Sequence, residues 1–156
     1  MNQLTNNKNF LSPLAFRLLI DPTRSQTTEY FVKSVSLPEV SIAQVNLPTP
    51  RIEIPFTGGT VEFSPLTVEF FVDEDMTNYQ EIYNWVVSQT DNDDSVNKYD
   101  LLLMVLSSHN NPNKKIQFYN AFPTSISSLN FDTTSTNITY LTASVTFSYS
   151  YFDFVK

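Results

Sequence analysis

Residues 141–151 read LTASVTFSYSY, a stretch in which apolar and hydroxyl-bearing side chains alternate without interruption. Because successive side chains of a β-strand point to opposite faces of its sheet, this period of two predicts one continuous strand. At about 3.3 Å per residue, the strand would be about 36 Å long. One face would pack into an apolar core. The other would carry only small hydroxyls, on Thr142, Ser144, Thr146, Ser148 and Ser150.

Alternating or continuous apolar runs elsewhere in the chain predict six more strands. The run at 101–107 is apolar on both faces, which favours a central position in a sheet. Strand patterns therefore dominate, and the chain is predicted to be mainly β. The predicted strands cover residues 14–20, 30–35, 52–56, 66–72, 101–107 and 116–122.

One segment, residues 76–89, has helical rather than strand periodicity. Thr77 and Gln80 have the spacing of a capping box, and the acidic run 73–75 would lie at the positive end of the helix dipole. The predicted apolar face of this helix consists of Met76, Tyr79, Ile82, Tyr83, Val86 and Val87.

Residues 36–56 form a proline-rich arm that is predicted to be irregular. Proline removes a backbone donor and is not found in central strands. The arm nevertheless carries apolar residues, Val40, Ile42, Val45 and Leu47. Such an arm either folds back on its own core or reaches a neighbouring molecule, and the pattern leaves both alternatives open.

Composition excludes several classes of chemistry. The 156 residues fit a single domain, 1–156, and contain no Cys, one His (His109) and two Gly (Gly58 and Gly59). The sequence lacks the residue types needed for several kinds of site. These are thiol catalysis, zinc knuckles, multi-His metal sites, P-loops and dinucleotide-binding motifs. We therefore expect no catalytic, cofactor-binding or metal-binding residues.

The remaining candidates for chemistry are weak. Residues 91–95 resemble the start of a calcium loop, but Val96 and Leu102 stand where Gly and Glu are needed. Residues 73–75 are explained by the helix dipole, and His109 lies in a turn-like sequence. Trp85 at helical spacing is expected in the core rather than in a sugar-binding platform.

Charge argues against a nucleic-acid binder. The formal net charge is −7, and no Lys or Arg occurs between Ile52 and Asn97, a stretch with ten acidic residues. Binding of phosphates requires a surplus of basic residues. The acidic stretch is either a solvated face or a surface that repels an anion. No run is long enough to span a membrane, and Pro13 and Arg17 interrupt any signal-peptide pattern, so cytosolic synthesis is expected.

Residues 31–87 resemble the tail tube proteins of contractile-tailed, T4-like bacteriophages. The resemblance consists of a strand ending in Leu37-Pro38, the proline-rich arm, the stretch Ile54 to Gly59, a strand at 66–70, and a helix with Tyr79, Tyr83 and Trp85 behind an acidic run. The inner tube protein of type VI secretion shares this plan.

The resemblance implies an antiparallel β-sandwich or rolled barrel with one flanking helix, whose strands join a ring-wide inner β-barrel on oligomerisation. It implies a structural subunit, not an enzyme, in stacked homo-hexameric rings that conduct DNA during ejection. A sheath protein would lie outside, a tape measure protein and double-stranded DNA would lie inside without specific binding, and baseplate and terminator proteins would cap the ends. The chain would be part of the virion tail, assembled in the host bacterial cytoplasm.

The same resemblance carries over to candidate residues. The arm would contact the adjacent ring through Val40, Ile42, Val45, Leu47, Ile52, Ile54 and Phe56. Glu62 and Glu69 are candidates for the lumen, and the hydroxyls of Thr142, Ser144, Thr146 and Ser148 suit a polar channel wall. Alternatives are a baseplate tube initiator or tail terminator with the same fold, a monomeric carbohydrate-binding β-sandwich, and an acid–base hydrolase for which no residue is preferred.

Overall fold

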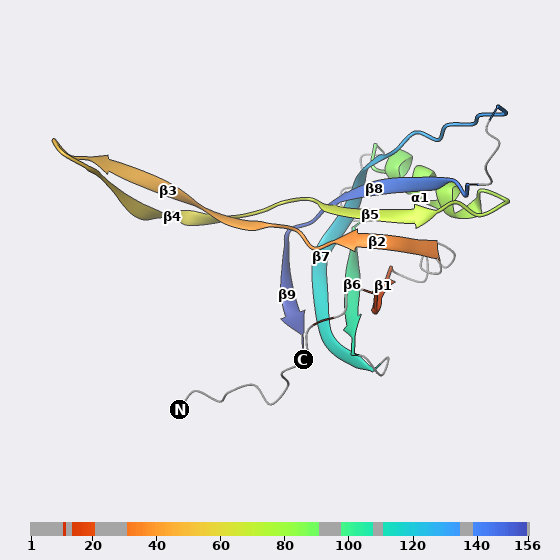
Figure 1. The fold of residues 1–156 in the computed structure, drawn as a ribbon, viewed down its shortest axis with the longest axis horizontal. Coiled ribbons are helices and arrows are strands. Elements are labelled where there is room, and N and C mark those ends of the chain that lie inside the picture. The colour runs from red at the N-terminus through yellow and green to blue at the C-terminus, as the bar shows by residue number, and fades with distance from the viewer. Residues whose placement is uncertain are drawn as a thin grey trace.

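The computed structural model describes residues 11, 14–20, 31–90, 98–107, 111–134 and 139–155. Within these ranges the chain forms nine strands and one helix (Figure 1). The elements are β1 (Phe16–Leu19), β2 (Val32–Ser36), β3 (Val40–Pro48), β4 (Glu53–Phe63), β5 (Leu66–Phe71), α1 (Thr77–Ser88), β6 (Tyr99–Leu106), β7 (Pro112–Ile126), β8 (Thr142–Ser148) and β9 (Tyr151–Val155).

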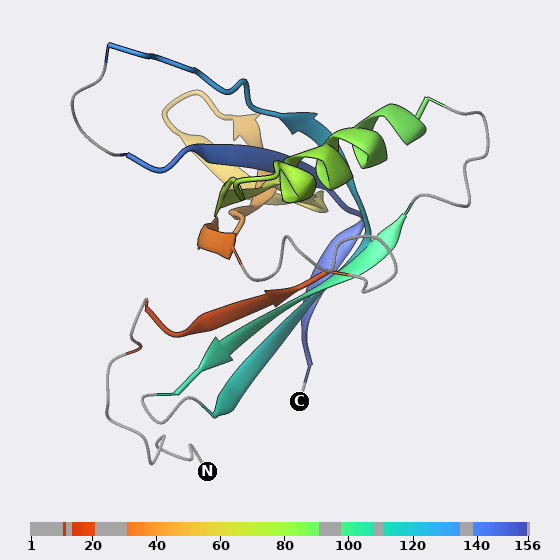
Figure 2. The ribbon, with the colours of Figure 1, turned by 90° about the vertical axis from the view of Figure 1, so that its right-hand side faces the viewer.

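Seven strands form the body of the molecule. Their order is β1-β6-β7-β8-β5-β2, with β9 also paired to β7, and every pairing is antiparallel. The long strand β7 belongs to both halves of this sheet, because its first part pairs with β6 and β9 and its last part pairs with β8. Figure 2 shows the two halves running in different directions from β7. The predicted mainly β fold with antiparallel sheets and one helix is confirmed.

The sheet turns a corner at Asn120, which has a φ of 54°. Asparagine tolerates this left-handed conformation better than most residues. The Asn120 amide donates a hydrogen bond to Asp100 Oδ1 (3.0 Å), and the Ser150 amide donates to the Tyr119 carbonyl (2.9 Å). The single strand predicted over residues 141–151 is therefore wrong. The chain leaves β8 at this corner and re-pairs as β9, so Tyr151 is 48% exposed and lies outside the core.

The alternation predicted for β8 is confirmed before the corner. Ala143, Val145 and Phe147 are at most 1% exposed and pack in one cluster with the buried residues of β5. The ring of Phe147 lies 5.6 Å from that of Trp85 on α1. The helix therefore covers the core-facing side of β5 and β8, and Trp85 is a core residue as expected.

Helix α1 lies where the pattern predicted it, and its buried face is shifted from the predicted one: Ile82, Tyr79 and Val86 pack against the core as expected, but Tyr83 and Val87 do not. Its fully buried residues are Asn78, Ile82 and Trp85, whereas Tyr83 and Val87 are 52% and 48% exposed. The Asn78 amide group donates to the Phe71 carbonyl (2.7 Å) and accepts from the Asp73 amide (3.3 Å). Because these bonds satisfy the side chain, a polar residue can face the core.

The predicted capping box at the start of α1 is wrong. Met76 occupies the N-cap position in a left-handed conformation (φ 55°), and no side chain caps the helix there. The first turn contains no acidic residue, so the run 73–75 precedes the helix. Asn78 instead holds this segment through the two hydrogen bonds to Phe71 and Asp73.

Strands β3 and β4 form a separate two-stranded sheet, here called the ribbon, which projects from the body (Figure 1). The predicted irregular arm over residues 36–56 is thus a regular hairpin that continues to Phe63. Its prolines are tolerated because both strands are edge strands, where a missing backbone donor can face solvent. Every residue of β3 is exposed, so the arm does not fold back on its own core.

Candidate assembly surfaces

The ribbon is anchored to the body by aromatic packing at its root. The ring of Phe63 lies 5.4 Å from Phe152 and 6.3 Å from Tyr149, both in edge-on or near edge-on contact. The Tyr149 hydroxyl donates to the Ser64 carbonyl (2.6 Å), and the Ser64 amide donates to the Glu39 carbonyl (3.0 Å). Burial raises the pKa of the Tyr149 hydroxyl above its ordinary value. The ribbon therefore leaves the body at a defined place.

The apolar residues of the ribbon lie on both of its faces. Residues opposite each other in an antiparallel pair share a face, and faces alternate along each strand. Near the root, Ile42 pairs with Val61; nearer the tip, Val45 pairs with Phe56. Positions 42 and 45 differ by an odd number, so these pairs project from opposite faces. We call Val40, Ile42 and Val61 the root patch, and Val45, Leu47, Ile54 and Phe56 the tip patch.

The seven residues predicted for the arm are all exposed in this structure. Their exposed fractions range from 39% for Ile54 to 65% for Ile52. Two apolar patches on opposite faces cannot both be covered by a single flat surface. Exposed apolar area of this kind is typical of a surface that meets another molecule. Their contact with an adjacent ring stays a prediction, and the predicted set did not include Val61, which shares the root patch with Val40 and Ile42.

Gly58 lies at the register shift that separates the two patches. The pairing passes from Ile42 opposite Val61 to Gln44 opposite Thr57, so β4 carries extra residues opposite Ala43. A Cβ on Gly58 would lie 2.3 Å from the Ala43 carbonyl oxygen, whereas a Cβ on Gly59 would meet nothing within 4 Å. Glycine is thus required at 58 by close backbone approach.

The hydroxyl face predicted on residues 142–148 extends across neighbouring strands. Thr146 lies opposite Thr67 of β5, and Ser144 lies opposite Glu69, which in turn faces Ser34 of β2. Ser125 of β7 lies opposite Thr146 on the other side. We call this set the hydroxyl face; it comprises Ser34, Ser36, Thr67, Glu69, Ser125, Thr142, Ser144, Thr146 and Ser148. Sequence reasoning named Glu69 on β5 but missed Ser34 and Ser36 on β2, Thr67 on β5 and Ser125 on β7, because register, not local pattern, brings them together.

The two predicted lumen acids are placed differently. Glu69 lies within the hydroxyl face, where Lys33 Nζ and the Ser34 hydroxyl donate to its carboxylate at 3.2 and 3.1 Å. These hydrogen bonds, chiefly that from Lys33, hold the pKa of Glu69 below its usual value. Glu62 instead lies on β4 opposite Ser41, in the ribbon. The structure therefore does not bring Glu62 together with Glu69 and the β8 hydroxyls.

Two edges of the half-sheet that carries the hydroxyl face lack a partner. The order β7-β8-β5-β2 ends at β2, and among the described residues no strand pairs with its outer edge. On β7, pairing with β6 ends at Ala121, so residues 122–126 are paired only on the β8 side. Unpaired backbone groups at sheet edges are templates for pairing with another chain.

The residues weighed for other chemistry are not gathered into a site. Trp85 is 1% exposed, and the Tyr79 hydroxyl donates to the Ser127 carbonyl (3.1 Å), so neither belongs to an aromatic platform with Tyr83. Residues 91–95 and His109 lie outside the described residues. In the part of the chain that the structure describes, no three potential metal ligands cluster, and no helix is long and apolar enough to cross a membrane.

The fold has solved relatives at low sequence identity. A chain of the sheath–tube complex of an extracellular contractile injection system (PVC) has a TM-score of 0.71 and 18% identity, covering 95% of this chain and 93% of that one. The tube-terminating cap of the anti-feeding prophage has a TM-score of 0.71 and 15% identity, with 98% and 95% coverage. Hcp1 from Flavobacterium johnsoniae has a TM-score of 0.56 and 18% identity, with 90% and 94% coverage.

Family comparison addresses the sequence itself. None of the curated proteins matches the chain. The family model described as the T4-like virus tail tube protein gp19 matches residues 33–153, which include all of β3 to β8 and most of β2 and β9. The hydroxyl face, the ribbon and residues 122–126 of β7 lie within that match, as does the β2 edge apart from Val32. The chain therefore belongs to the T4-like virus tail tube protein gp19 family, whose members are structural tube proteins.

Proposed function

We propose that the chain is a non-enzymatic tube subunit that forms hexameric rings, and that the rings stack into a hollow tube. The observation that carries this proposal is the pair of unpaired edges on the half-sheet β7-β8-β5-β2. Pairing of β2 in one copy with residues 122–126 of β7 in the next would close these edges around a ring. Closure of a sheet into a barrel removes its edges altogether.

In this arrangement the hydroxyl face lines the lumen. The opposite face of β5 and β8 packs against α1, so only the hydroxyl face is free to line a channel. Hydroxyls are neutral, and the Glu69 charge is balanced by Lys33. Six copies at a net charge of −7 make a ring of about −42. A wall without surplus cations does not hold phosphates by counterion release, so DNA can slide through it.

The ribbon then joins one ring to the next, with the tip and root patches covered by neighbouring copies. The tube is surrounded by a sheath, holds a tape measure protein and double-stranded DNA, and meets baseplate and terminator proteins at its ends. It belongs to a phage tail or injection particle assembled in the bacterial cytoplasm. A terminator role is the second candidate, because the PVC tube complex and the anti-feeding prophage cap match with equal TM-scores.

Negative-stain electron microscopy of the purified chain tests the proposal. We expect six-fold rings and, at higher concentration, tubes whose wall is one subunit thick. Single rings that never stack would favour the terminator role. A chain that stays monomeric at every concentration would contradict both roles.

The lumen assignment has its own test. Replacing Ser144, Thr146 and Ser148 together by Lys adds three positive charges per copy to the hydroxyl face. We expect tubes that still form but slow or stop DNA passage, measured as DNA release from the assembled particle. The matched control places three Lys on exposed helix positions Thr77, Gln80 and Asn84. Equal DNA release from both triple variants would exclude the hydroxyl face from the lumen.

A further inference from the structure

An open apolar pocket lies at the end of β5, where the chain turns towards α1. Its volume is about 720 Å³. Two of its rings, Phe31 and Phe71, are each 37% exposed, and a third, Tyr140, is 79% exposed. The pocket is lined by Phe31, Phe71, Val72, Asp73, Glu74 and Tyr140.

The pocket combines this aromatic lining with unpaired carboxylates. Asp73 Oδ1 is buried and has no hydrogen-bond partner among the described residues, and because it is closed to solvent it adds negative charge beside the pocket, not an acceptor that a docking group can reach. Glu74 beside it is exposed, and no ion pair is formed by it within the described part of the chain. An arginine side chain suits such a site, because its guanidinium stacks on aromatic rings and donates several hydrogen bonds to carboxylates.

The tip of the ribbon supplies such a side chain. Thr49 to Ile52 form a tight turn in which the Thr49 amide donates to the Ile52 carbonyl (3.2 Å) and the Ile52 amide donates to the Thr49 hydroxyl (3.2 Å). This turn presents Arg51, the only Lys or Arg between Lys33 and Lys98. Arg51 is exposed and has no ion-pair partner within the described residues. Ile52 beside it is 65% exposed and offers an apolar side chain.

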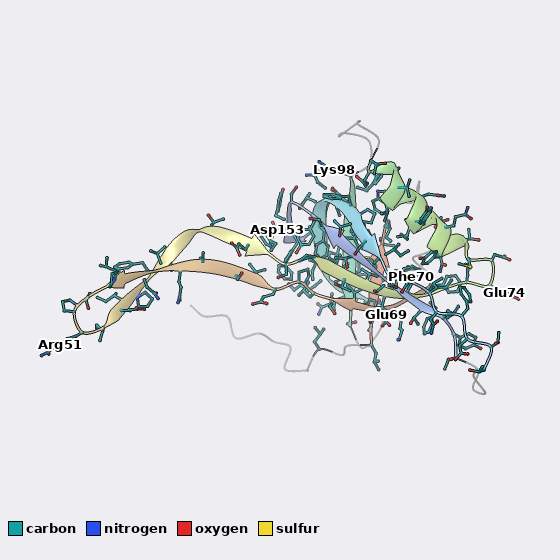
Figure 3. All side chains as sticks on the ribbon, turned by 90° about the horizontal axis from the view of Figure 1, so that it is seen from above. Arg51, Glu69, Phe70, Glu74, Lys98 and Asp153 are labelled. Carbon is teal, nitrogen blue, oxygen red and sulfur yellow. The ribbon has the colours of Figure 1, made fainter. Side chains whose placement is uncertain are left out.

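The tip and the pocket lie at opposite ends of the molecule. Figure 3 shows Arg51 at the far end of the ribbon and Glu74 at the other extreme, beyond the helix. One copy therefore cannot fill its own pocket with its own tip. A contact between different surfaces of two copies is head-to-tail, and its repetition gives a ring where the rotation closes and an open chain of copies where it does not. Strands in closed barrels tilt by about 35–45° from the barrel axis. A ribbon that continues in the direction of such strands would therefore extend both parallel to the axis of the tube and around its circumference.

We propose that the ribbon tip of one copy docks into this pocket of a second copy, with Arg51 bound by Glu74 next to Asp73 and with Ile52 against the aromatic lining. The inference rests on the proposed tube function and names the partner surface of the ribbon. It makes the contact between layers directional, because each copy contributes a tip at one end and a pocket at the other.

Charge reversal tests the docking. Arg51→Glu and Glu74→Arg are each expected to raise the protein concentration needed for tube formation about tenfold or more, because like charges would meet across the contact. Sedimentation and negative staining measure this concentration. The double variant with both changes is expected to recover most of the loss. Asp75→Arg, with the same charge change on an exposed neighbour outside the pocket, is the control and should assemble as the parent does.

Cross-linking gives an independent readout, since the chain has no Cys. A double variant with Arg51→Cys and Glu74→Cys should give a ladder of covalent multimers in tubes treated with a short bis-maleimide. Tubes built from Asp75→Cys alone should give none. If the parent forms tubes but the charge-reversal variants assemble as well as the parent does, the docking is overturned and the tube function stands. The same conclusion follows if the parent forms tubes but the double-Cys variant gives no ladder. Failure of the parent chain to form tubes would instead contradict the proposed function.

Discussion

The body and the ribbon carry apolar side chains in similar alternating patterns, yet they use them in opposite ways. In β8 of the body, Val145 and Phe147 are 1% and 0% exposed. In the ribbon, Val45 and Phe56 are 62% and 55% exposed. The body has a second layer, the helix, to cover its apolar face, whereas the ribbon has none within the described chain. Apolar residues in the body therefore stabilise the fold, and those in the ribbon are available for contacts between molecules.

The largest contrast is expected between two phenylalanines. Phe147→Ala removes a fully buried ring beside Trp85 and should lower the free energy of unfolding by about 3–5 kcal/mol. Phe56→Ala should change it by less than about 0.5 kcal/mol, because the ring is already half exposed. Denaturant unfolding of the unassembled chain measures both values.

Tube formation by the folded chain should depend on Phe56, the residue with the smaller expected effect on stability. Phe56→Ala is expected to weaken tube formation while the body remains folded, since the ring belongs to the tip patch. Comparable losses of stability from the two variants would show that the ribbon packs on its own body in solution. Normal tube formation by Phe56→Ala would remove that ring from the contact.

A smaller effect is expected from the two glycines of the ribbon. Gly58→Ala places a Cβ against the Ala43 carbonyl, so the two strands must separate locally. Such overpacking typically costs about 1–3 kcal/mol. We expect faster amide hydrogen exchange across β3 and β4, with the body unchanged. Gly59→Ala is the matched control, because its Cβ has open space. Equal amide hydrogen exchange in Gly58→Ala and Gly59→Ala would show that the close backbone approach at the register shift is not needed to keep β3 and β4 paired.

The smallest effect concerns Glu69. Its pKa is lowered in the folded chain by hydrogen bonds from Lys33 and Ser34, so the stabilisation is present above the usual glutamate pKa of about 4.3 and is lost as the pH falls through the lowered value. An exposed pair contributes less than about 1 kcal/mol. Glu69→Gln should therefore be slightly less stable than the parent at pH 7 and approach the stability of the parent as the pH falls below the lowered pKa, as measured by thermal unfolding. If the difference in stability between Glu69→Gln and the parent does not change with pH, the Lys33–Glu69 pair is not its cause.

Several elements were predictable from local pattern. The inward side chains of 143–147, the strand at 66–71, the helix near 77–88 and the burial of Trp85 all follow from periodicity and side-chain size. The apolar residues of the arm were also noted, but their pattern left open whether the arm is buried or exposed, and only the resemblance assigned them to a contact with another ring. These features depend on neighbours a few positions away, which a sequence displays directly.

Other features depend on residues distant in the chain. The hydrogen bonds of Asn120 and Ser150 bend the sheet and divide the expected final strand, and the hydrogen bonds of Asn78 near Phe71 let this polar residue join the buried face of the helix. Strand register assembles the hydroxyl face and separates Glu62 from it. Local periodicity specifies which side chains share a face of one element. Pairing and packing between elements specify which faces meet, and these interactions exist only once the chain is folded.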